Sequence, residues 1–385
     1  DAGFESTGVT SYRVAANLAV RIMDYPAAEA AIREGLRYAD AIEQSHCRQQ
    51  MAATSAFLAW TSGRWDDASQ IARQELVERG CRRGVTGAID VIGLVAMSRG
   101  RIDEARRWLT ESHDSGVAAD DVELTMGPLW GLAEVDVLAG DPAAASKRCE
   151  EALALAVRSG ERALLVPFVV TGIRAALAAR RPEDAEHWLD RVRTHLADLP
   201  AARPALRHAE GLVRLSQGST TAARDALEAA VHGWTEIGRI WESSWARLDL
   251  AQCLMRSNRY GEAASLLAAA RATAEQVESP PLITRLDELA RIGRGRGEVN
   301  EPWWPLTARE FEVARLIAEG LTNGEIADRL DIAPKTASSH VEHILAKLSV
   351  TRRAEIAAWT AAVGRPLAAA GDHRDREGAV AVHGR

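Results

Sequence analysis

The chain of 385 residues is 47% hydrophobic but only 5% aromatic, and its net charge is −7. This length allows two or three domains, while the abundance of Ala and Leu favours helices over sheet. The negative charge argues against a nonspecific nucleic-acid coat, so any contact with nucleic acid must be local.

No apolar run reaches the roughly 18 residues that a membrane-spanning helix needs, and no signal peptide opens the sequence. The four cysteines are scattered, without a CxxC motif: Cys47, Cys81, Cys149 and Cys253. Such cysteines are typical of buried thiols in a reducing compartment. We therefore expect a cytoplasmic protein without membrane contact, and the initial Asp suggests a piece of a longer chain.

A short pattern recurs over the first 280 residues: a helical apolar run ends in a turn, and an acidic or proline-containing step then leads to an alanine. These alanines lie 37 to 40 residues apart, at Ala28, Ala68, Ala105, Ala145, Ala185, Ala223 and Ala263. A nearly fixed period of this size indicates one repeated supersecondary unit. The sequence therefore predicts an all-α solenoid of about seven helical hairpins over residues 1–290.

The residues around each alanine explain the hairpin. Four glycines suit the left-handed conformation that ends a helix, namely Gly63, Gly100, Gly140 and Gly218. Four aspartates then place negative charge at the start of the next helix, namely Asp66, Asp103, Asp141 and Asp184. One hairpin cannot bury its own apolar face, so neighbouring hairpins must stack. The pattern resembles the tetratricopeptide repeat class over about residues 10–285, with a period longer than the usual 34 residues.

A solenoid of this kind offers a concave surface for a peptide, a protein or a small ligand, none of which the sequence names. The tryptophans with the spacing to line that surface are Trp60, Trp130, Trp234, Trp241 and Trp245. Packing between helices is the favoured interpretation of each. We predict a flexible linker at 291–304, where alternating glycines lack the pattern of a nucleotide-binding loop. The segment 366–385 lacks periodicity and is expected to be disordered.

Residues 305–365 carry dense signals of helix ends. The capping boxes "TARE" at 307–310 and "TNGE" at 322–325 each open a helix. Pro334 lies between two apolar runs, and proline is tolerated in the first turn of a helix but not in its interior. It therefore starts a new helix, whose apolar residues share one face: Ala337, Val341, Ile344, Leu345 and Leu348. With a fourth helix from Thr351, these elements predict a four-helix domain with a helix-turn-helix.

The stretch "LTAREFEVARLIAEGLTNGEIADRLDIAPKTASSHVEHILAKLSVTRRAEI" resembles the DNA-binding domain of LuxR-type transcription regulators. With the upstream repeats, the chain resembles the C-terminal portion of the large ATP-binding LuxR regulators, in which a nucleoside-triphosphatase module precedes the repeats. The sequence contains no GxxxxGK[ST] motif, so we expect no such module here and no cofactor. The resemblance implies a regulator that binds double-stranded promoter DNA as a homodimer and acts with RNA polymerase.

The helix after Pro334 carries polar and basic groups on its solvent face, and such groups reach base edges and phosphates. The predicted DNA contacts are Thr322, Asn323, Lys335, Thr336, Ser338, Ser339, His340, Glu342, His343, Lys347, Arg352 and Arg353. Phosphates are assigned to Lys335, Lys347 and Arg353, and base edges to Ser338, Ser339 and Glu342. The chain departs from the family pattern at Ala337, Ser338 and Glu342, so its DNA preference cannot be copied from relatives.

The last helix predicts the dimer interface, through Ile356, Ala357, Trp359, Thr360 and Val363. The alternative is that Ile356, Trp359 and Val363 close the core of the domain. The pair His340 and His343 has no third metal ligand nearby, and no motif of a catalytic nucleophile occurs, so we expect neither a metal site nor an enzyme. A second hypothesis is an adaptor protein whose last four helices serve assembly only.

Overall fold

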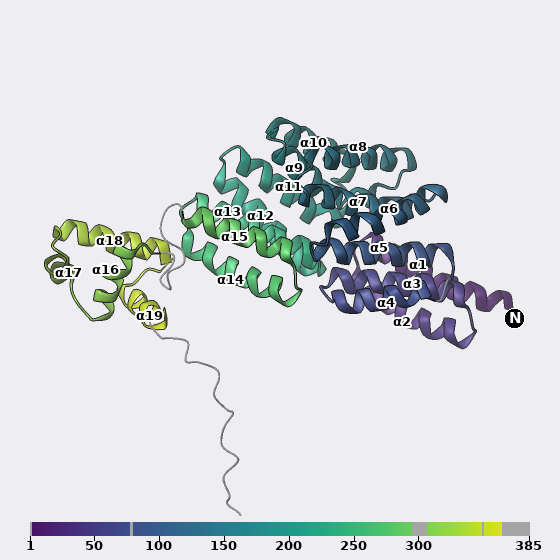
Figure 1. Cartoon of the computed structure of the whole chain (residues 1–385), viewed down its shortest axis with the longest axis horizontal. Coiled ribbons are helices and arrows are strands. Elements are labelled where there is room, and N and C mark those ends of the chain that lie inside the picture. The colour runs from purple at the N-terminus through teal and green to yellow at the C-terminus, as the bar shows by residue number, and fades with distance from the viewer. Residues whose placement is uncertain (1, 78–79, 295–305, 349, 364–385) are drawn as a thin grey trace, which may run out of the picture. The chain divides into compact units, whose positions relative to one another are not determined.

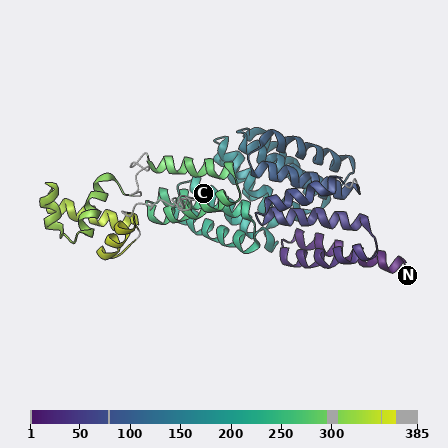
Figure 2. The ribbon, with the colours of Figure 1, turned by 60° about the horizontal axis from the view of Figure 1, so that its bottom comes forward.

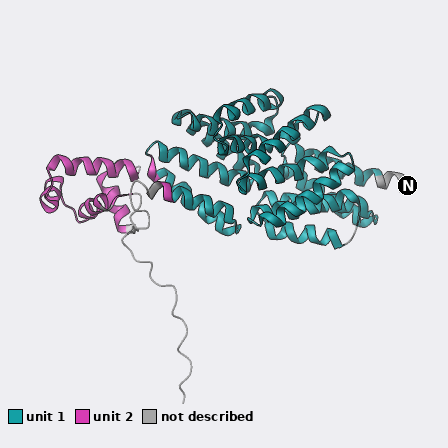
Figure 3. Cartoon of the chain, turned by 45° about the horizontal axis from the view of Figure 1, so that its top comes forward, with its two compact units in different colours: residues 1–258, 262–290 teal, residues 259–261, 291–385 magenta. Residues whose placement is uncertain are grey.

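The computed structural model describes residues 2–77, 80–294, 306–348 and 350–363. The described residues form nineteen α-helices and two short 3-10 helices, without a strand. The prediction of an all-α chain is confirmed. Two compact units divide it, residues 1–258 with 262–290 and residues 259–261 with 291–385 (Figure 3). No helix of the described ranges is both long and apolar enough to cross a membrane.

The first unit is built from successive pairs of antiparallel helices (Figure 1). Their bounds are α1 (Ala2–Arg21), α2 (Tyr25–Ala41), α3 (Ser45–Thr61), α4 (Trp65–Val77), α5 (Arg82–Ser98), α6 (Ile102–Ala118), α7 (Val122–Leu138), α8 (Pro142–Ser159), η1 (Arg162–Leu165), α9 (Phe168–Ala178), α10 (Pro182–Leu196), η2 (Pro200–Ala202), α11 (Arg203–Ser216), α12 (Thr220–Ile237), α13 (Ile240–Arg256), α14 (Tyr260–Gln276) and α15 (Pro280–Arg294). Because α15 continues to Arg294, the first four residues of the predicted linker 291–304 are helical. Residues 295–304 of that linker and the predicted tail 366–385 lie outside the described residues.

The turns between paired helices use a left-handed residue. The predicted glycines have positive φ, with values of 82° at Gly63, 69° at Gly100, 77° at Gly140 and 80° at Gly218. Other turns place a residue with a side chain in the same conformation, with φ between 51° and 59°: Met23, Glu43, Asp120, Arg180, Asn258 and Glu278. A side chain is rarely tolerated at positive φ. The repeat pattern nevertheless includes the turns at Met23, Arg180 and Asn258, and it missed those at Glu43, Asp120 and Glu278.

The alanine of each repeat packs at a crossing of two helices. All seven are fully buried, with 0% exposure: Ala28, Ala68, Ala105, Ala145, Ala185, Ala223 and Ala263. A methyl group at this position lets the helix backbones approach closely, since a larger side chain would separate them. The odd-numbered helices α1 to α11 stack successively on one another as the inner layer of the solenoid.

The later helices of the solenoid return to the early ones (Figure 2). Ser279 Oγ donates a hydrogen bond to the carbonyl oxygen of Ser98 at 2.7 Å. Trp241 Nε1 donates to Glu134 Oε2 at 3.1 Å. These contacts join residues more than a hundred positions apart, so the solenoid curls back on itself and its centre is packed.

The second unit contains α16 (Ala308–Ala318), α17 (Asn323–Leu330), α18 (Pro334–Leu348) and α19 (Arg353–Val363). Thr307 caps α16 and Thr322 caps α17, each in a reciprocal capping box with the glutamate three residues later. Pro334 is the first residue of α18, as the sequence predicts. The α19 helix begins two residues later than expected.

Candidate nucleic-acid interface and solenoid pocket

The two helices α17 and α18 meet through a short turn. Asp331 ends α17 in the left-handed conformation, with φ of 50°, and α18 begins three residues later. Ile326 and Ala327 of α17 pack with Ala337 and Ile344 of α18 in one buried cluster. One face of α18 is thereby fixed against the domain, and its opposite face is left to solvent.

That opposite face of α18 carries the exposed side chains Lys335, Thr336, Glu342 and His343. Lys335, Ser339, Glu342 and Ala346 recur at steps of three or four residues and so follow one another along the helix. Ser339 at the centre of this face and His340 at its margin are half-buried. This surface, the α18 face, offers an ammonium, hydroxyls, an imidazole and a carboxylate, which together can contact phosphates and base edges.

Three residues with predicted DNA contacts are bonded to one another instead. Asn323 Nδ2 donates to Ser338 Oγ at 3.1 Å, and Arg353 Nη1 donates to Asn323 Oδ1 at 2.6 Å. Arg353 also donates to the carbonyl oxygen of Leu321. Ser338 therefore faces α17 and is not central on the solvent face, contrary to its assignment. Arg353 ties α19 to the start of α17, so its guanidinium already has partners within the domain, and its assignment to phosphate stays a prediction.

Lys347 has an internal partner as well. Its Nζ lies 2.6 Å from Glu310 Oε2, and the Glu310 side chain is only 6% exposed. The same oxygen accepts from the backbone N–H of Thr307 at 2.7 Å. Burial would raise the pKa of Glu310, but the Lys347 ammonium and the Thr307 donors outweigh it and lower that pKa. Lys347 thus stabilises the start of α16, and its assignment to a phosphate stays a prediction.

The exposed cations near the α18 face are fewer than predicted. Lys335, Arg329 and Arg352 are exposed, and none forms an ion pair with another described residue. Thr322 is exposed too, but its hydroxyl is engaged in the capping box with Glu325 at 2.8 Å. These three cations are therefore not engaged in an ion pair within the described part of the chain.

The α19 helix supports the core alternative for two of its predicted dimer residues. Ile356 has 0% exposure within the domain core. Trp359 packs edge-on against Phe311, with ring centroids 6.5 Å apart. Thr360 is buried and donates to the carbonyl oxygen of Ile356 at 2.8 Å. The Val363 side chain lies outside the described residues. Ala357 and Trp359 are half-buried, and the dimer interface on α19 stays a prediction.

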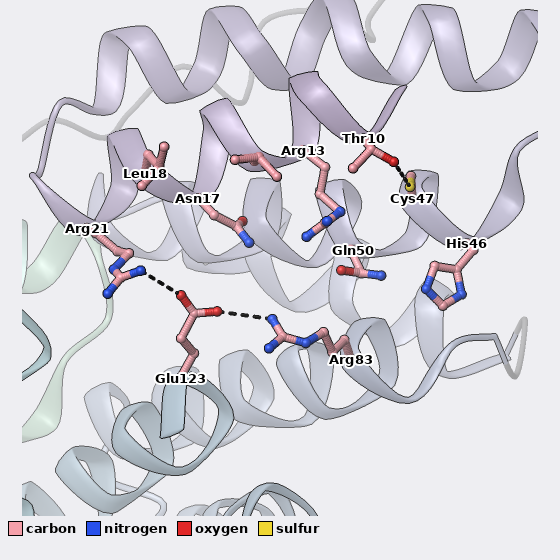
Figure 4. Close-up of a pocket in the computed structure, with 11 residues that line it drawn as sticks. Thr10, Arg13, Asn17, Leu18, Arg21, His46, Cys47, Gln50, Arg83 and Glu123 are labelled. Carbon is pink, nitrogen blue, oxygen red and sulfur yellow. Dashed lines mark hydrogen bonds and ion pairs between the residues drawn. The ribbon is translucent and has the colours of Figure 1, made fainter. Parts of the chain in front are cut away.

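A second candidate site lies within the solenoid. A cavity of about 260 Å³, here called the inner pocket, is walled by α1, α2, α3, α5, α7 and η1, with Arg239 from the turn before α13. Its apolar lining includes Phe57, Leu94, Met126 and Trp130. An outer pocket of about 530 Å³, lined by Thr10, Arg13, His46 and Cys47 among others, adjoins it (Figure 4). The two share Asn17, Arg21, Gln50, Arg83 and Glu123.

The arginines at this boundary already have anionic partners. Arg21 Nη1 lies 3.2 Å and Arg83 Nη1 lies 3.0 Å from the two carboxylate oxygens of Glu123 (Figure 4). Arg21 also pairs with Glu161, and Arg83 with Asp121. Burial would lower the pKa of Arg83, but the hydrogen bond that Arg83 donates to Glu123 and the charge of Asp121 raise it. The boundary is thus a closed network without a free cation among these side chains.

Arg239 is buried and also has partners, although its Nε atom makes no hydrogen bond to a described residue. Its Nη1 donates to the Tyr25 hydroxyl at 3.0 Å, and its Nη2 pairs with Glu242. The guanidinium lies 5.4 Å from the ring centroid of Trp60 and 5.8 Å from that of Trp130. Burial would lower the pKa of Arg239, but Glu242 and Tyr25 raise it. This one side chain joins helices from distant repeats.

The tryptophans act mainly in packing, which was the favoured interpretation. Trp60, Trp130, Trp234 and Trp241 are at most 4% exposed. Trp60 Nε1 donates to Ser98 Oγ at 3.0 Å, and Trp130 Nε1 to Thr171 Oγ1 at 3.1 Å. Trp130 nonetheless contributes part of its surface to the inner pocket.

Asp90 of α5 is the charged residue of the inner pocket that lacks a partner. Its Oδ1 atom is enclosed and makes no hydrogen bond to any described residue. Burial raises the pKa of Asp90 to about 7. A Cβ added at Gly127 would lie 2.8 Å from Asp90 Oδ2, so the glycine of α7 leaves room for the carboxylate. The sequence analysis missed this residue, because a single aspartate within a helix gives no local signal.

Comparisons with known proteins agree with both units. A model of the "Bacterial regulatory proteins, luxR family" matches residues 304–360, and a model of the tetratricopeptide repeat matches residues 214–280. An HTH-type transcriptional regulator of Mycobacterium bovis is 40% identical over 83 residues, 21% of this chain and 9% of that protein. LiaR, a transcriptional regulatory protein of Bacillus subtilis, is 37% identical over 106 residues, 28% of this chain and 48% of LiaR. The chain therefore covers less than half of either relative.

Solved structures are similar to the solenoid fold. A Rap protein complexed with competence and sporulation factor has a TM-score of 0.56 and 13% identity, covering 94% of this chain and all of that one (100%). NprR in complex with its cognate peptide NprX has a TM-score of 0.54 and 12% identity, covering 92% and 98%. At such identities the likeness concerns the fold alone. The chain thus carries a helix-turn-helix domain of the LuxR family at 304–360 and tetratricopeptide-type repeats before it.

Proposed function

We propose that this chain is a sequence-specific DNA-binding regulator of transcription whose solenoid receives a signal. The observation that carries the proposal is the α18 face, a polar and partly basic helix surface in a LuxR-family domain. Helices presented in this way enter the major groove of DNA with their first turns near base edges. The family and the helical repeats indicate a role that is not enzymatic.

In this proposal the roles on the α18 face are divided by charge and position. Lys335 at the start of α18 and Arg352 before α19 contact phosphates and fix the orientation of the domain. Ser339 and His343 donate or accept at base edges. Glu342 accepts from a cytosine amino group, and its charge disfavours approach to phosphate.

The solenoid is the receiving module in this proposal. The Rap and NprR structures with similar folds were solved with competence and sporulation factor and with a peptide, respectively. The inner pocket gives this chain a place for a ligand of its own. We further propose that the protein acts in the cytoplasm, binds promoter DNA as a homodimer through the Ala357 side of α19, and contacts RNA polymerase.

Fluorescence anisotropy with duplex DNA and heparin as competitor tests DNA binding. We expect the affinity of the full chain to fall steeply between about 50 and 200 mM salt, since released counterions drive phosphate binding. Lys335→Ala should reduce the slope of log affinity against log salt by about one. Lys147→Ala is the matched control, because this exposed lysine of α8 carries the same charge and belongs to the solenoid unit.

The adaptor hypothesis makes the opposite forecast for the same experiment. An assembly domain would bind duplex DNA weakly, and Lys335→Ala and Lys147→Ala would change that binding equally. Such a result would refute the proposed function, whatever the solenoid binds.

A further inference from the structure

The inner pocket combines an apolar lining with one carboxylate oxygen that has no hydrogen-bond donor among the described residues. Phe57, Leu94, Met126 and Trp130 contribute apolar surface. Asp90 Oδ1 is enclosed there without a hydrogen-bond donor among the described residues. A buried carboxylate without a donor is costly, and native proteins rarely retain one without a use.

The arginines of the pocket do not donate a hydrogen bond to Asp90, because each is already paired with another group. Arg21 and Arg83 bind Glu123, and Arg239 binds Glu242 and the Tyr25 hydroxyl. Burial is the cause of the raised pKa of Asp90, and no charge of these residues contributes to it. Asp90 therefore needs a donor from outside the chain. Arg239 Nε also makes no hydrogen bond to a described residue, but its guanidinium is already paired with the Glu242 carboxylate.

The size of the cavity limits what can bring that donor. About 260 Å³ falls just below the range of about 300–1,000 Å³ usual for ligand pockets, so the cavity suits a small molecule more than several residues of a peptide. Gly87 and Gly127 have no side chain, so the backbone itself forms the pocket wall at these two positions. A Cβ at Gly127 would lie 2.8 Å from Asp90 Oδ2. The shape of the pocket thus depends on the space around the carboxylate.

We propose that the inner pocket binds a small amphipathic organic amine, whose ammonium group pairs with Asp90 while its apolar body lies against Phe57, Met126 and Trp130. This inference supplies the chemistry of the signal that the proposed function leaves open, and it rests on the solenoid acting as the receiver. An ammonium satisfies Asp90 with charge-assisted hydrogen bonds, which are stronger than those of a neutral donor.

Isothermal titration of the full chain, without DNA, with three molecules that share an indole body tests the proposal. Tryptamine carries an ammonium, tryptophol a hydroxyl and indole-3-acetate a carboxylate. At about pH 8, where Asp90 is mostly ionised, we expect tryptamine to bind about tenfold or more tightly than tryptophol. Asp90→Asn should abolish that difference, because the amide keeps the shape but loses the charge. Glu111→Gln, an exposed residue of α6, is the control for net charge.

The outcomes separate cleanly. Equal affinities for tryptamine and tryptophol, tighter binding of indole-3-acetate, or no binding of tryptamine would each overturn the proposal. A preference for tryptamine that survives Asp90→Asn would also overturn it, because another group would then bind the ammonium. Since DNA is absent from the titration, failure here leaves the proposed DNA binding intact, and failure of DNA binding leaves this result standing.

Discussion

Replacing Asp90 by Asn should make the solenoid more stable at alkaline pH and leave its stability unchanged at acidic pH. Burial raises the pKa of Asp90 from an ordinary value of 3.8 to about 7. Between these values the folded state binds a proton that the unfolded state has released. The free energy of unfolding of the wild type therefore falls as pH rises through this window, and the loss is complete above about pH 7.

The size of the effect follows from the same shift. At about 1.36 kcal/mol per pKa unit, moving the pKa to about 7 corresponds to about 4 kcal/mol. Asp90 retains some solvent contact at the pocket, which screens its charge, and we expect roughly half of that value, about 2 kcal/mol. Asn keeps the volume of the side chain and cannot ionise, so the variant should lack the pH-dependent loss.

Urea unfolding followed by tryptophan fluorescence is the assay, since eight of the eleven tryptophans lie in the solenoid. The comparison is made at about pH 5 and pH 8 for the wild type, Asp90→Asn and the Glu111→Gln control. An advantage of Asp90→Asn that is equal at both pH values, or absent at the higher one, would refute the reasoning. The other charged groups around the pocket are present in all three proteins, so their contributions to the pH dependence of stability cancel in the comparison. These groups are Arg21, Arg83, Glu123, Arg239 and Glu242.

Four further variants test the C-terminal domain. Lys347→Met should lower the stability of the domain by about 1.5–3 kcal/mol in thermal unfolding, because it breaks the ion pair with Glu310. The salt slope of DNA binding should not change, and a lower slope would show that Lys347 contacts phosphate. Arg353→Lys should lower the melting temperature, because lysine cannot donate to Asn323 and Leu321 in the same geometry; an unchanged melting temperature would argue against that tie. Glu342→Gln should raise affinity for all sequences and relax preference at one base pair by about 1–3 kcal/mol in a binding-site profile, and an unaltered profile would remove Glu342 from the base contacts. Ala361→Arg, on the exposed side of α19, should abolish two-to-one binding in sedimentation equilibrium with DNA, whereas retained stoichiometry would place the dimer elsewhere.

Local chemistry made the repeats and the helix starts predictable. The alanines, glycines and capping boxes act within one turn of the chain, so their pattern is visible in the sequence. Pro334 is the clearest case, because a residue that cannot continue a helix marks the start of α18. The same local rules missed three turns with a side chain at positive φ, at Glu43, Asp120 and Glu278, where tertiary packing overrides the preference for glycine.

The candidate sites depend on contacts that the sequence does not reveal. Lys347 and Arg353 lie at the border between the buried and exposed faces of their helices. The side-chain rotamer there decides whether the cation points to solvent or to a neighbouring helix. Ile356 fits both a core position and a dimer face by spacing alone, and only the packing of four helices places it inside. Asp90 and Arg239 are even less predictable, because their surroundings come from distant repeats that meet only when the solenoid curls back.

Selection of bound DNA from a random duplex library by the full chain tests the central claim most directly. The account predicts an enriched motif of two inverted half-sites about one helical turn apart, as a dimer with one recognition helix per subunit requires. It also predicts that Glu342→Gln relaxes the base preference at one position of each half-site, while Lys335→Ala keeps the motif and weakens every sequence alike. A library that shows no enrichment over its starting composition would contradict the assignment of α18 as a DNA-reading helix.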